Sequence, residues 1–496
     1  MKNFKEGLDY VKEEIISVKG KVPEYISGIS VDSRNVKENY VFFAMPGQKE
    51  DGKKYIKSAI ENGAICIIFS GELSEDYFVD NISYVQVRDI QKVLGRLSAW
   101  FNDFPSQKLT IIGVTGTNGK TTVTHLLYHY WKTKGEKAGL IGTIYNKLDE
   151  ETLSTNFTTP QPPELQSLLK KMVEKGIKYV SMEISSHALA LRRTEDLYID
   201  GAVFTNLTQD HLDFHHTMEE YFSAKKKIFN LLKRDGFGVL NKDDDWVKQV
   251  FINNKTIWCS LYDKVDLYVS HWENREEGLK LLISTPKGDL DLNLKLRGKF
   301  NVYNILLATG VLIGLDEDLE NIKYAWESFN GVPGRLEFVD EGQNFSVIID
   351  YAHTPDGLNN ILSTVSEFTK GRKILVFGCG GDRDPFKRPK MGEIAGKLAD
   401  YVIITSDNPR NEDPYKIIRE IEEGIKGSGF KDYVVIENRE LAIKHAIEVA
   451  KQGDSVIIAG KGHEDYQIIG SEKIHFSDKE VAQKYLRERK SHEAKS

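Results

Sequence analysis

The first segment that could carry out chemistry is a run of small and polar residues between an apolar stretch and a helical pattern. The run reads Gly116, Thr117, Asn118, Gly119, Lys120, Thr121 and Thr122. Glycines let backbone N–H groups wrap phosphate oxygens, and the start of a helix adds a favourable dipole. Lys120 supplies a positive charge, and the Thr121 hydroxyl suits Mg²⁺. A strict phosphate-loop motif would have glycine at Val114. The context still predicts an ATP phosphate site.

Three further polar groups each follow an apolar stretch and contain an acid, a histidine or a lysine. Glu183 ends YVSME, His211 lies in TNLTQDHLD, and Lys225 lies in YFSAK. Because Mg²⁺ prefers carboxylate, hydroxyl and water ligands, we predict Glu183 as a ligand beside Thr121. His211 is either a second ligand or a residue that orients water. For Lys225, the residue types alone favour a solvated helix lysine, since two lysines follow it.

Three strand-like segments near the C-terminus also end in residues that suit a charged ligand. They are followed by GCGGDRD at 378–384, DNPR at 407–410 and GKGHED at 460–465. The planar guanidinium groups of Arg383 and Arg410 can clamp carboxylates, and Glu464 can hold an ammonium group. The combination predicts a site for a zwitterionic substrate.

These groups need a scaffold that brings distant segments together, and the apolar pattern provides one. Short β-branched runs recur, each followed by Gly, Ser or Asn and then by a helical pattern, which is typical of parallel sheets flanked by helices. We expect strands at 109–116, 179–186, 201–207, 236–241, 346–353, 373–381, 401–409 and 455–462. Ligands of such sheets bind outside the carboxyl ends of the strands, where the candidate residues lie.

The length of 496 residues predicts about three domains, and the fold class is α/β. Pro105 and the polar residues after it separate an N-terminal domain, 1–105, from a central domain, 106–331. The central domain is expected to be a P-loop-type ATPase domain with a mainly parallel sheet. A Rossmann-like C-terminal domain, 332–496, begins near the segment VPGR.

Composition excludes several classes of protein. The chain has 67 basic and 74 acidic residues and no long basic run, which argues against a nucleic-acid surface. Its three scattered cysteines form no CxxC pair, which argues against a disulfide framework or a zinc site. The sequence has no apolar leader and no stretch long enough to span a bilayer. We expect a cytoplasmic monomer that binds small molecules, without nucleic-acid or membrane partners.

The order of these motifs resembles that of the Mur ligase family, whose members build the peptidoglycan stem peptide. The resemblance extends over nearly the whole chain. It is carried by VDSR at 31–34, FAMPG at 43–47, TGTNGKTT at 115–122, EISSH at 183–187, NLTQDHLD at 206–213, YFSAK at 221–225, GKFNVYN at 298–304, DYAHTP at 350–355 and DNPR at 407–410. It implies an ATP-dependent, ADP-forming ligase that joins a carboxylate to an amine through an acyl-phosphate.

The resemblance also implies a catalytic centre that residue types alone do not define. Its catalytic residues are Lys120, Glu183, His211 and Lys225. Lys225 is expected to be carbamylated and, together with Thr121, Glu183 and His211, to hold two Mg²⁺ ions. Asn301 and Arg335 are candidate nucleotide contacts. Asn301 is equally consistent with a cap of the helix that we expect to begin near it.

One branch of the family adds meso-2,6-diaminopimelate to UDP-N-acetylmuramoyl-L-alanyl-D-glutamate in peptidoglycan synthesis, a process that supports cell shape and division. The resemblance assigns to the diaminopimelate site Arg383, Asp407, Asn408, Pro409, Arg410, Gly460 and Glu464. Relatives that add lysine lack the arginine at position 410, as expected for a substrate without a distal carboxylate. The UDP-linked substrate is assigned to Ser33 in the N-terminal domain and to Thr158, Thr159, Ser185 and Arg193.

Two alternatives stay open at this point. The first keeps the chemistry and changes the amine to lysine or another diamino acid. The second is a P-loop ATPase that acts as a conformational switch, which would leave the charged strand ends of the C-terminal domain unexplained.

Overall fold

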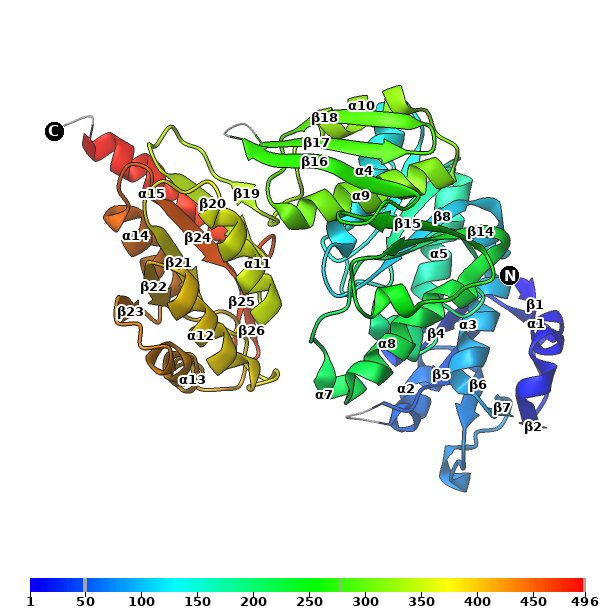
Figure 1. Ribbon diagram of the computed structural model, residues 1–496. Coiled ribbons are helices and arrows are strands. Elements are labelled where there is room, and N and C mark those ends of the chain that lie inside the picture. Colours follow the sequence, from blue (N-terminus) through cyan, green and yellow to red (C-terminus); the bar gives the residue numbers. More distant parts are fainter. Residues whose placement is uncertain (48–50, 276–277, 494–496) are drawn as a thin grey trace.

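The computed structural model describes residues 1–47, 51–275 and 278–493, and most of its strands belong to three main sheets (Figure 1). The N-terminal sheet has the order β2 (Ile15–Lys19), β7 (Ser83–Val87), β6 (Ala64–Ser70), β5 (Tyr40–Ala44), β4 (Gly28–Ser30). The last four run parallel, and β2 pairs antiparallel at one edge. The helix α3 (Ile90–Phe101) buries Val93, Leu94 and Leu97 in the apolar cluster against this sheet.

The central sheet is built around β8 (Thr110–Thr115), the strand that precedes the phosphate loop. Its parallel part has the order β9 (Ala138–Ile141), β12 (Tyr179–Glu183), β8, β13 (Ile199–Phe204), β14 (Leu232–Asn241), β15 (Lys255–Ser260). Buried apolar clusters that include residues of α4 (Lys120–Thr133), α5 (Pro162–Glu174), α9 (Lys299–Gly314) and α10 (Leu319–Ser328) pack against it. The parallel arrangement brings the ends of β8, β12 and β13 to one edge.

The structure adds strands at both edges of the central sheet that the sequence-based prediction omitted. At one edge β16 (Leu267–Arg275) pairs parallel with β15, and β17 (Gly278–Thr285) and β18 (Gly288–Leu294) follow antiparallel. At the other edge β10 (Asn146–Leu148) and β11 (Glu151–Leu153) are antiparallel. In β18, Leu290, Leu292 and Leu294 are buried and alternate with exposed polar residues. This period of two was a readable signal for a half-buried strand.

The C-terminal sheet is doubly wound. Its order is β19 (Glu337–Phe338), β20 (Ser346–Asp350), β24 (Ser455–Ala459), β21 (Lys373–Phe377), β22 (Tyr401–Ile404), β23 (Tyr433–Val435), and only β19 is antiparallel among these described strands. One apolar cluster packs α11 (Pro355–Ser366), α12 (Lys387–Leu398) and α13 (Pro414–Gly427), and another packs α14 (Arg439–Val449) and α15 (Asp478–Glu493). The α/β class with mostly parallel sheets is therefore confirmed.

The chain passes from the first sheet to the second between Val87 and Thr110, and from the second to the third between Leu294 and Glu337. The predicted boundaries at 105/106 and 331/332 lie inside these intervals. In the described ranges, none of the helices combines the length and the apolarity that crossing a membrane requires. All three cysteines lie in those ranges, and each is buried as a free thiol.

Candidate active site

The phosphate loop connects β8 to α4 and needs glycine at both of its turns. Gly116 and Gly119 have φ of 143° and 89°, a region that side chains disfavour. A Cβ at Gly116 would lie 1.8 Å from Oγ1 of Thr205, and one at Gly119 would lie 2.4 Å from Oδ1 of Asn304. The Thr205 hydroxyl donates a 2.6 Å hydrogen bond to the carbonyl of Asn118. The residues after β13 thus hold the loop in shape.

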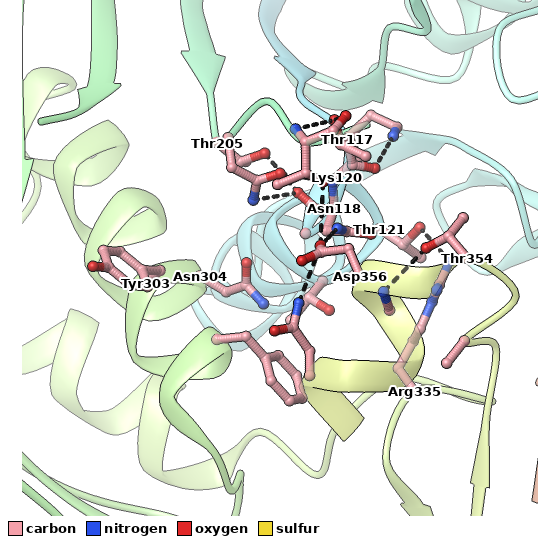
Figure 2. A pocket seen from close by; sticks show the side chains of 18 of the residues that line it. Thr117, Asn118, Lys120, Thr121, Thr205, Tyr303, Asn304, Arg335, Thr354 and Asp356 are labelled. Carbon is pink, nitrogen blue, oxygen red and sulfur yellow. Dashed lines mark hydrogen bonds between the residues drawn. The ribbon is translucent and has the colours of Figure 1, made fainter. Parts of the chain in front are cut away.

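The loop opens into a cavity of about 650 Å³ lined by the central and C-terminal domains (Figure 2). The lining includes Thr117, Asn118, Gly119, Lys120, Thr121, Thr122, Thr158, Glu183, Thr205, His211, Asp243, Tyr303, Asn304, Arg335, Tyr351 and Asp356. A cavity of this size suits a small-molecule ligand, and its mixture of hydroxyls, amides and charges suits a polar one. The structure therefore brings together most of the residues that were predicted for the nucleotide and the metal.

Two lysines meet at the loop. Lys120 Nζ donates hydrogen bonds to the carbonyls of Gly116 and Thr117, at 2.8 and 3.0 Å. Lys225, in α8 (Met218–Lys226), donates a 2.8 Å bond to the same Gly116 carbonyl and is 1% exposed. Burial, reinforced by the neighbouring Lys120 charge, holds the pKa of Lys225 well below its usual range. A solvated surface position for Lys225 is therefore wrong, and its amine is set up to be neutral.

Glu183 is a fully buried carboxylate at the end of β12. It accepts hydrogen bonds from the Thr121 hydroxyl at 3.1 Å and from the Thr143 backbone and hydroxyl at 3.0 and 2.9 Å. Hydroxyl and carboxylate oxygens lie next to each other here, which is the donor chemistry that Mg²⁺ selects. The described residues include no cluster of three or more His, Cys, Asp or Glu that could hold a metal. A metal at Glu183 and Thr121 would thus need ATP oxygens and water to complete its coordination.

His211 lines the same cavity at the start of α7 (Leu212–His215) and has left-handed backbone, with φ of 53°. Its Nε2 lies 3.4 Å from Oδ2 of Asp210, and its ring centroid lies 4.8 Å from that of His187. The ring is therefore held at the edge of the cavity between a carboxylate and a second imidazole, where it can meet a bound ligand or a water.

The C-terminal domain contributes residues directly to the phosphate loop. Asp356, in the first turn of α11, accepts hydrogen bonds from Nδ2 of Asn118 at 2.7 Å and from the Thr208 hydroxyl at 3.2 Å. Arg335 donates a 3.4 Å bond to the Thr121 hydroxyl, and its Nε is buried with no hydrogen-bond partner among the described residues. Sequence reasoning missed Asp356, although it directly follows the DYAHTP motif.

The helix α9 presents the second asparagine of the GKFNVYN segment, Asn304, to the loop. Gly298 is the N-cap of α9, so the alternative of Asn301 as the cap is wrong. Nδ2 of Asn301 donates to the Arg297 carbonyl at 2.9 Å, and Asn301 lines a separate cavity near the linker at 330–338. Asn304, one helical turn later, lines the main cavity instead. The repeated asparagine at a spacing of three was the signal for it.

The residues predicted for the UDP-linked substrate fall into two places. Thr158 and Thr159 lie near Ser185 and Arg193. The Thr158 and Thr143 hydroxyls are 3.1 Å apart, Thr159 accepts a 3.0 Å bond from the Ser185 backbone, and its carbonyl accepts a 3.1 Å bond from Arg193. Within the described part of the chain, Arg193 Nε is buried and has no hydrogen-bond partner. Ser33 lies in the N-terminal domain, where its carbonyl accepts a 2.8 Å bond from Asn62.

A second polar cluster forms at the carboxyl ends of β24, β21 and β22, which are adjacent in the C-terminal sheet. Lys461, fully buried, donates hydrogen bonds to Oδ1 of Asn408 at 3.3 Å and to Oε2 of Glu464 at 3.2 Å. It also lies 3.8 Å from a carboxylate oxygen of Asp407. Asn408 Nδ2 donates to Glu464 at 3.2 Å. Sequence reasoning gave no role to Lys461, which ties three predicted residues together.

The two predicted arginines flank Gly380. An added Cβ at Gly380 would lie 3.0 Å from Nη1 of Arg410 and 3.7 Å from Cγ of Arg383. Arg410 has left-handed backbone and donates a 2.8 Å bond to the carbonyl of Gly381, whereas Arg383 is exposed. Pro409, between Asn408 and Arg410, is buried. The guanidinium group of Arg410 and the aliphatic part of Arg383 thus lie at the strand end that carries Gly380.

Tyr351 connects this cluster to the phosphate loop. The Arg335 guanidinium lies 4.6 Å from the Tyr351 ring centroid, within the range of a cation–π contact. The Tyr351 hydroxyl donates a 3.5 Å bond to Oε1 of Glu464. Since Arg335 also reaches Thr121, a short chain of side chains joins the two candidate sites.

The chain matches three domain models of the Mur ligase family. The Mur ligase family catalytic domain matches residues 25–102, the Mur ligase middle domain matches 114–312, and the Mur ligase glutamate ligase domain matches 334–462. A UDP-N-acetylmuramoyl-L-alanyl-D-glutamate–2,6-diaminopimelate ligase of Caldanaerobacter subterraneus subsp. tengcongensis is 43% identical over 97% of this chain and 99% of its own. The same-named protein of Geobacillus thermodenitrificans is 43% identical over 95% and 97%.

Solved structures agree with this relationship. A structure of a UDP-N-acetylmuramoyl-L-alanyl-D-glutamate–2,6-diaminopimelate ligase is 32% identical, with a TM-score of 0.67 over 96% of this chain and 98% of that one. MurF ligase from Thermotoga maritima in complex with ADP shares the fold at 20% identity, with a TM-score of 0.65 over 93% of this chain and 98% of that one. The family and the ATP-dependent ligase class predicted from the motifs are confirmed, and the chain belongs to the Mur ligase family.

Proposed function

We propose that this protein is an ATP-dependent ligase that joins meso-2,6-diaminopimelate to UDP-N-acetylmuramoyl-L-alanyl-D-glutamate. The observation that carries the proposal is that Arg383 and Arg410 lie at Gly380, on a strand end next to those that carry Asn408 and Glu464. Asn408 bonds to Glu464, which Tyr351 and Arg335 link to the phosphate loop. Guanidinium groups bind carboxylates, and Glu464 with Asn408 binds an ammonium group. Diaminopimelate has a second amino-acid head that needs both kinds of group. The names of the relatives support this choice.

The chemistry follows from two displacements. The terminal carboxylate of the D-glutamyl residue attacks the γ-phosphorus of ATP, the bond to ADP breaks, and an acyl-phosphate forms. An amine of diaminopimelate then attacks the acyl carbon, phosphate leaves, and the nitrogen loses a proton. Residues Gly116 to Thr122 position the phosphates, and Lys120 offsets their charge. Catalysis therefore rests on positioning and on charge neutralisation.

Mg²⁺ belongs to this proposal because Glu183 and Thr121 present adjacent hard oxygens to the cavity. Bound Mg²⁺ would neutralise charge on the phosphates. His211 is the further candidate ligand, and carbamylated Lys225 is the fourth. The low pKa of the buried Lys225 amine supports carbamylation, because only a neutral amine adds CO₂. A carbamate would turn the buried amine into an anionic oxygen ligand near the Gly116 carbonyl.

The division of labour among the domains is part of the same proposal. Residues 1–105 would hold the uridine end through Ser33, 106–331 would hold ATP, and 332–496 would hold the amino acid. Thr158, Thr159, Ser185 and Arg193 would hold the sugar and peptide, and the partnerless Nε of Arg193 supports this role. ATP, the nucleotide-linked substrate and the three free thiols favour a cytoplasmic enzyme of peptidoglycan precursor synthesis, which underlies cell shape and division.

The test is phosphate release with ATP, Mg²⁺ and UDP-N-acetylmuramoyl-L-Ala-D-Glu, with meso-diaminopimelate or L-lysine in parallel reactions. We expect turnover only with diaminopimelate. Turnover with lysine would retain the ligase and reject the role of Arg410. Release that is indifferent to both amines would reject the ligase in favour of an uncoupled ATPase.

A further inference from the structure

A fully buried ion pair lies directly behind the candidate amino-acid site. Arg439 is the first residue of α14, and Asp478 is the first residue of α15. Nε and Nη2 of Arg439 donate hydrogen bonds to the two carboxylate oxygens of Asp478 at 2.7 and 2.8 Å, and both side chains have 0% exposure. A charge pair that is removed from water in this way gains little stability over apolar residues of the same size. Its directional bonds therefore need a separate explanation.

The remaining guanidinium protons provide that explanation. Nη2 also donates to the carbonyl of Ala459 at 2.9 Å, and Nη1 donates to the carbonyl of Ser406 at 3.3 Å. Ser406 immediately precedes Asp407, and Ala459 immediately precedes Gly460. One side chain thus holds the backbone on which two of the three segments of the amino-acid site begin.

These two segments are not neighbours in the ladder of hydrogen bonds. The strand β21 lies between β24 and β22, so no direct strand pairing sets the distance from the end of one to the end of the other. The segments nevertheless meet closely, because a Cβ at Gly460 would lie 2.6 Å from Oδ2 of Asp407. The planar guanidinium group of Arg439 bonds to both strand ends and is itself held in place by its two bonds to Asp478.

We propose that Arg439 is a positioning residue for the amino-acid substrate, and that Asp478 orients it. Arg439 sets the separation between Asp407–Asn408 on one segment and Lys461–Glu464 on the other. It therefore also sets the geometry of the groups that bind the ammonium group of the substrate. This inference rests on the proposed function. Lysine in place of Arg439 would keep the charge but has a single nitrogen, which cannot contact both strand-end carbonyls and both oxygens of Asp478.

The experiment compares Arg439→Lys with Arg372→Lys in the full-length enzyme. Arg372 also forms an ion pair with two hydrogen bonds, both to Oδ2 of Asp454, at the opposite, amino-terminal ends of β21 and β24, away from the ligand sites. We expect Arg439→Lys to raise KM for meso-diaminopimelate by about tenfold to a hundredfold, the scale of a small misplacement of substrate contacts. KM for ATP and for the UDP-linked substrate should stay within about twofold. Arg372→Lys should leave all three KM values unchanged.

A merely structural Arg439 would give a different pattern. In that case Arg439→Lys would lower the melting temperature and the amount of active enzyme, with all three KM values unchanged, and this result would overturn the proposal. If Arg439→Lys does not fold, Asp478→Asn takes its place, because it loosens the same guanidinium and carries the same expectation for KM. A wild-type enzyme that shows no diaminopimelate-dependent turnover would instead reject the proposed function, so the two failures are distinguishable.

Discussion

Nδ2 of Asn118 in the phosphate loop donates a 2.7 Å hydrogen bond to Oδ2 of Asp356 in the C-terminal domain, 238 positions later in the chain. The same oxygen accepts a bond from the Thr208 hydroxyl at 3.2 Å. One carboxylate thus holds two segments of the central domain against the start of α11, inside the cavity proposed for ATP (Figure 2). The bond links the position of the C-terminal domain to the shape of the phosphate loop.

Asp356→Ala should therefore weaken both the contact between the C-terminal and central domains and the use of ATP. Hydrogen bonds to a charged group contribute about 1.5–3 kcal/mol, so kcat/KM for ATP should fall by about tenfold to a hundredfold. Small-angle scattering should show a larger radius of gyration. Asn360→Ala is the matched control, because it removes only a bond of 3.2 Å to the same oxygen from within α11. Equal behaviour of the two variants would contradict this role.

Glu183→Gln should remove the negative charge at the proposed Mg²⁺ site while keeping the shape of the side chain. Glutamine keeps the volume and can still accept from Thr143, but it lacks the negative charge that a divalent cation needs. We expect kcat to fall by about 10²–10³-fold, the scale of losing one electrostatic contact to the transferring group, and the Mg²⁺ requirement to rise. A Mg²⁺ titration of phosphate release measures both. The control is Thr143→Ala, which removes one 2.9 Å bond to the carboxylate and should lower kcat much less. If Glu183→Gln kept the wild-type kcat, Glu183 would have no role as a metal ligand.

Arg410→Ala should remove discrimination between amines. The side chain would contact a carboxylate that diaminopimelate has and lysine lacks, and a buried charged contact of this kind contributes about 2–5 kcal/mol. We expect kcat/KM for meso-diaminopimelate to fall by at least about thirtyfold, toward the level with L-lysine, which should not change. Lys416→Ala, on the exposed side of α13, serves as the control for loss of a nearby cation. An equal loss with both amines would show that Arg410 supports the fold of the site.

Lys225 should make stability depend on pH in alkaline solution. Its unfolded pKa is near 10.5 and its folded pKa is much lower, so between these values the unfolded chain binds one proton more. The contribution of Lys225 to the free energy of unfolding therefore rises with pH through this window, by about 1.4 kcal/mol per pH unit. In CO₂-free buffer, the difference in unfolding free energy between wild type and Lys225→Met should rise with pH as the pH approaches about 10.5 from below.

The same pair of proteins tests carbamylation. CO₂ adds only to the neutral amine of the folded enzyme, so bicarbonate should raise the melting temperature of the wild type by mass action. Lys225→Met should show no such rise. Intact-mass measurement under native conditions should find one added CO₂ in the wild type only. An equal response of both proteins to bicarbonate would assign the effect to salt.

The amino-acid sequence by itself determined the elements and chemistry that depend on local patterns. Gly116 to Thr122 form a phosphate loop because the glycines, the lysine and the preceding β-branched strand are adjacent in the chain. The starts of β20, β21, β22 and β24 were predictable from short apolar runs, whereas each strand ends three to five residues before its expected end. The order of the motifs was sufficient for the family, since each is a short, contiguous set of residues. The strand β18 could also have been predicted, because its buried leucines alternate with exposed polar residues.

Tertiary structure alone decided which of these residues act together. The bond of Asn118 to Asp356, the burial of Lys225 under Gly116 and the contacts of Arg439 with Ser406 and Ala459 join positions far apart in the chain. The choice of Asn304 over Asn301 depends on the rotation of α9 against the loop. Such contacts follow from how whole elements pack, and the pKa of a buried lysine follows from the water that this packing excludes. Local sequence specifies neither the contacts nor the pKa, because both depend on neighbouring residues that only the complete fold brings together.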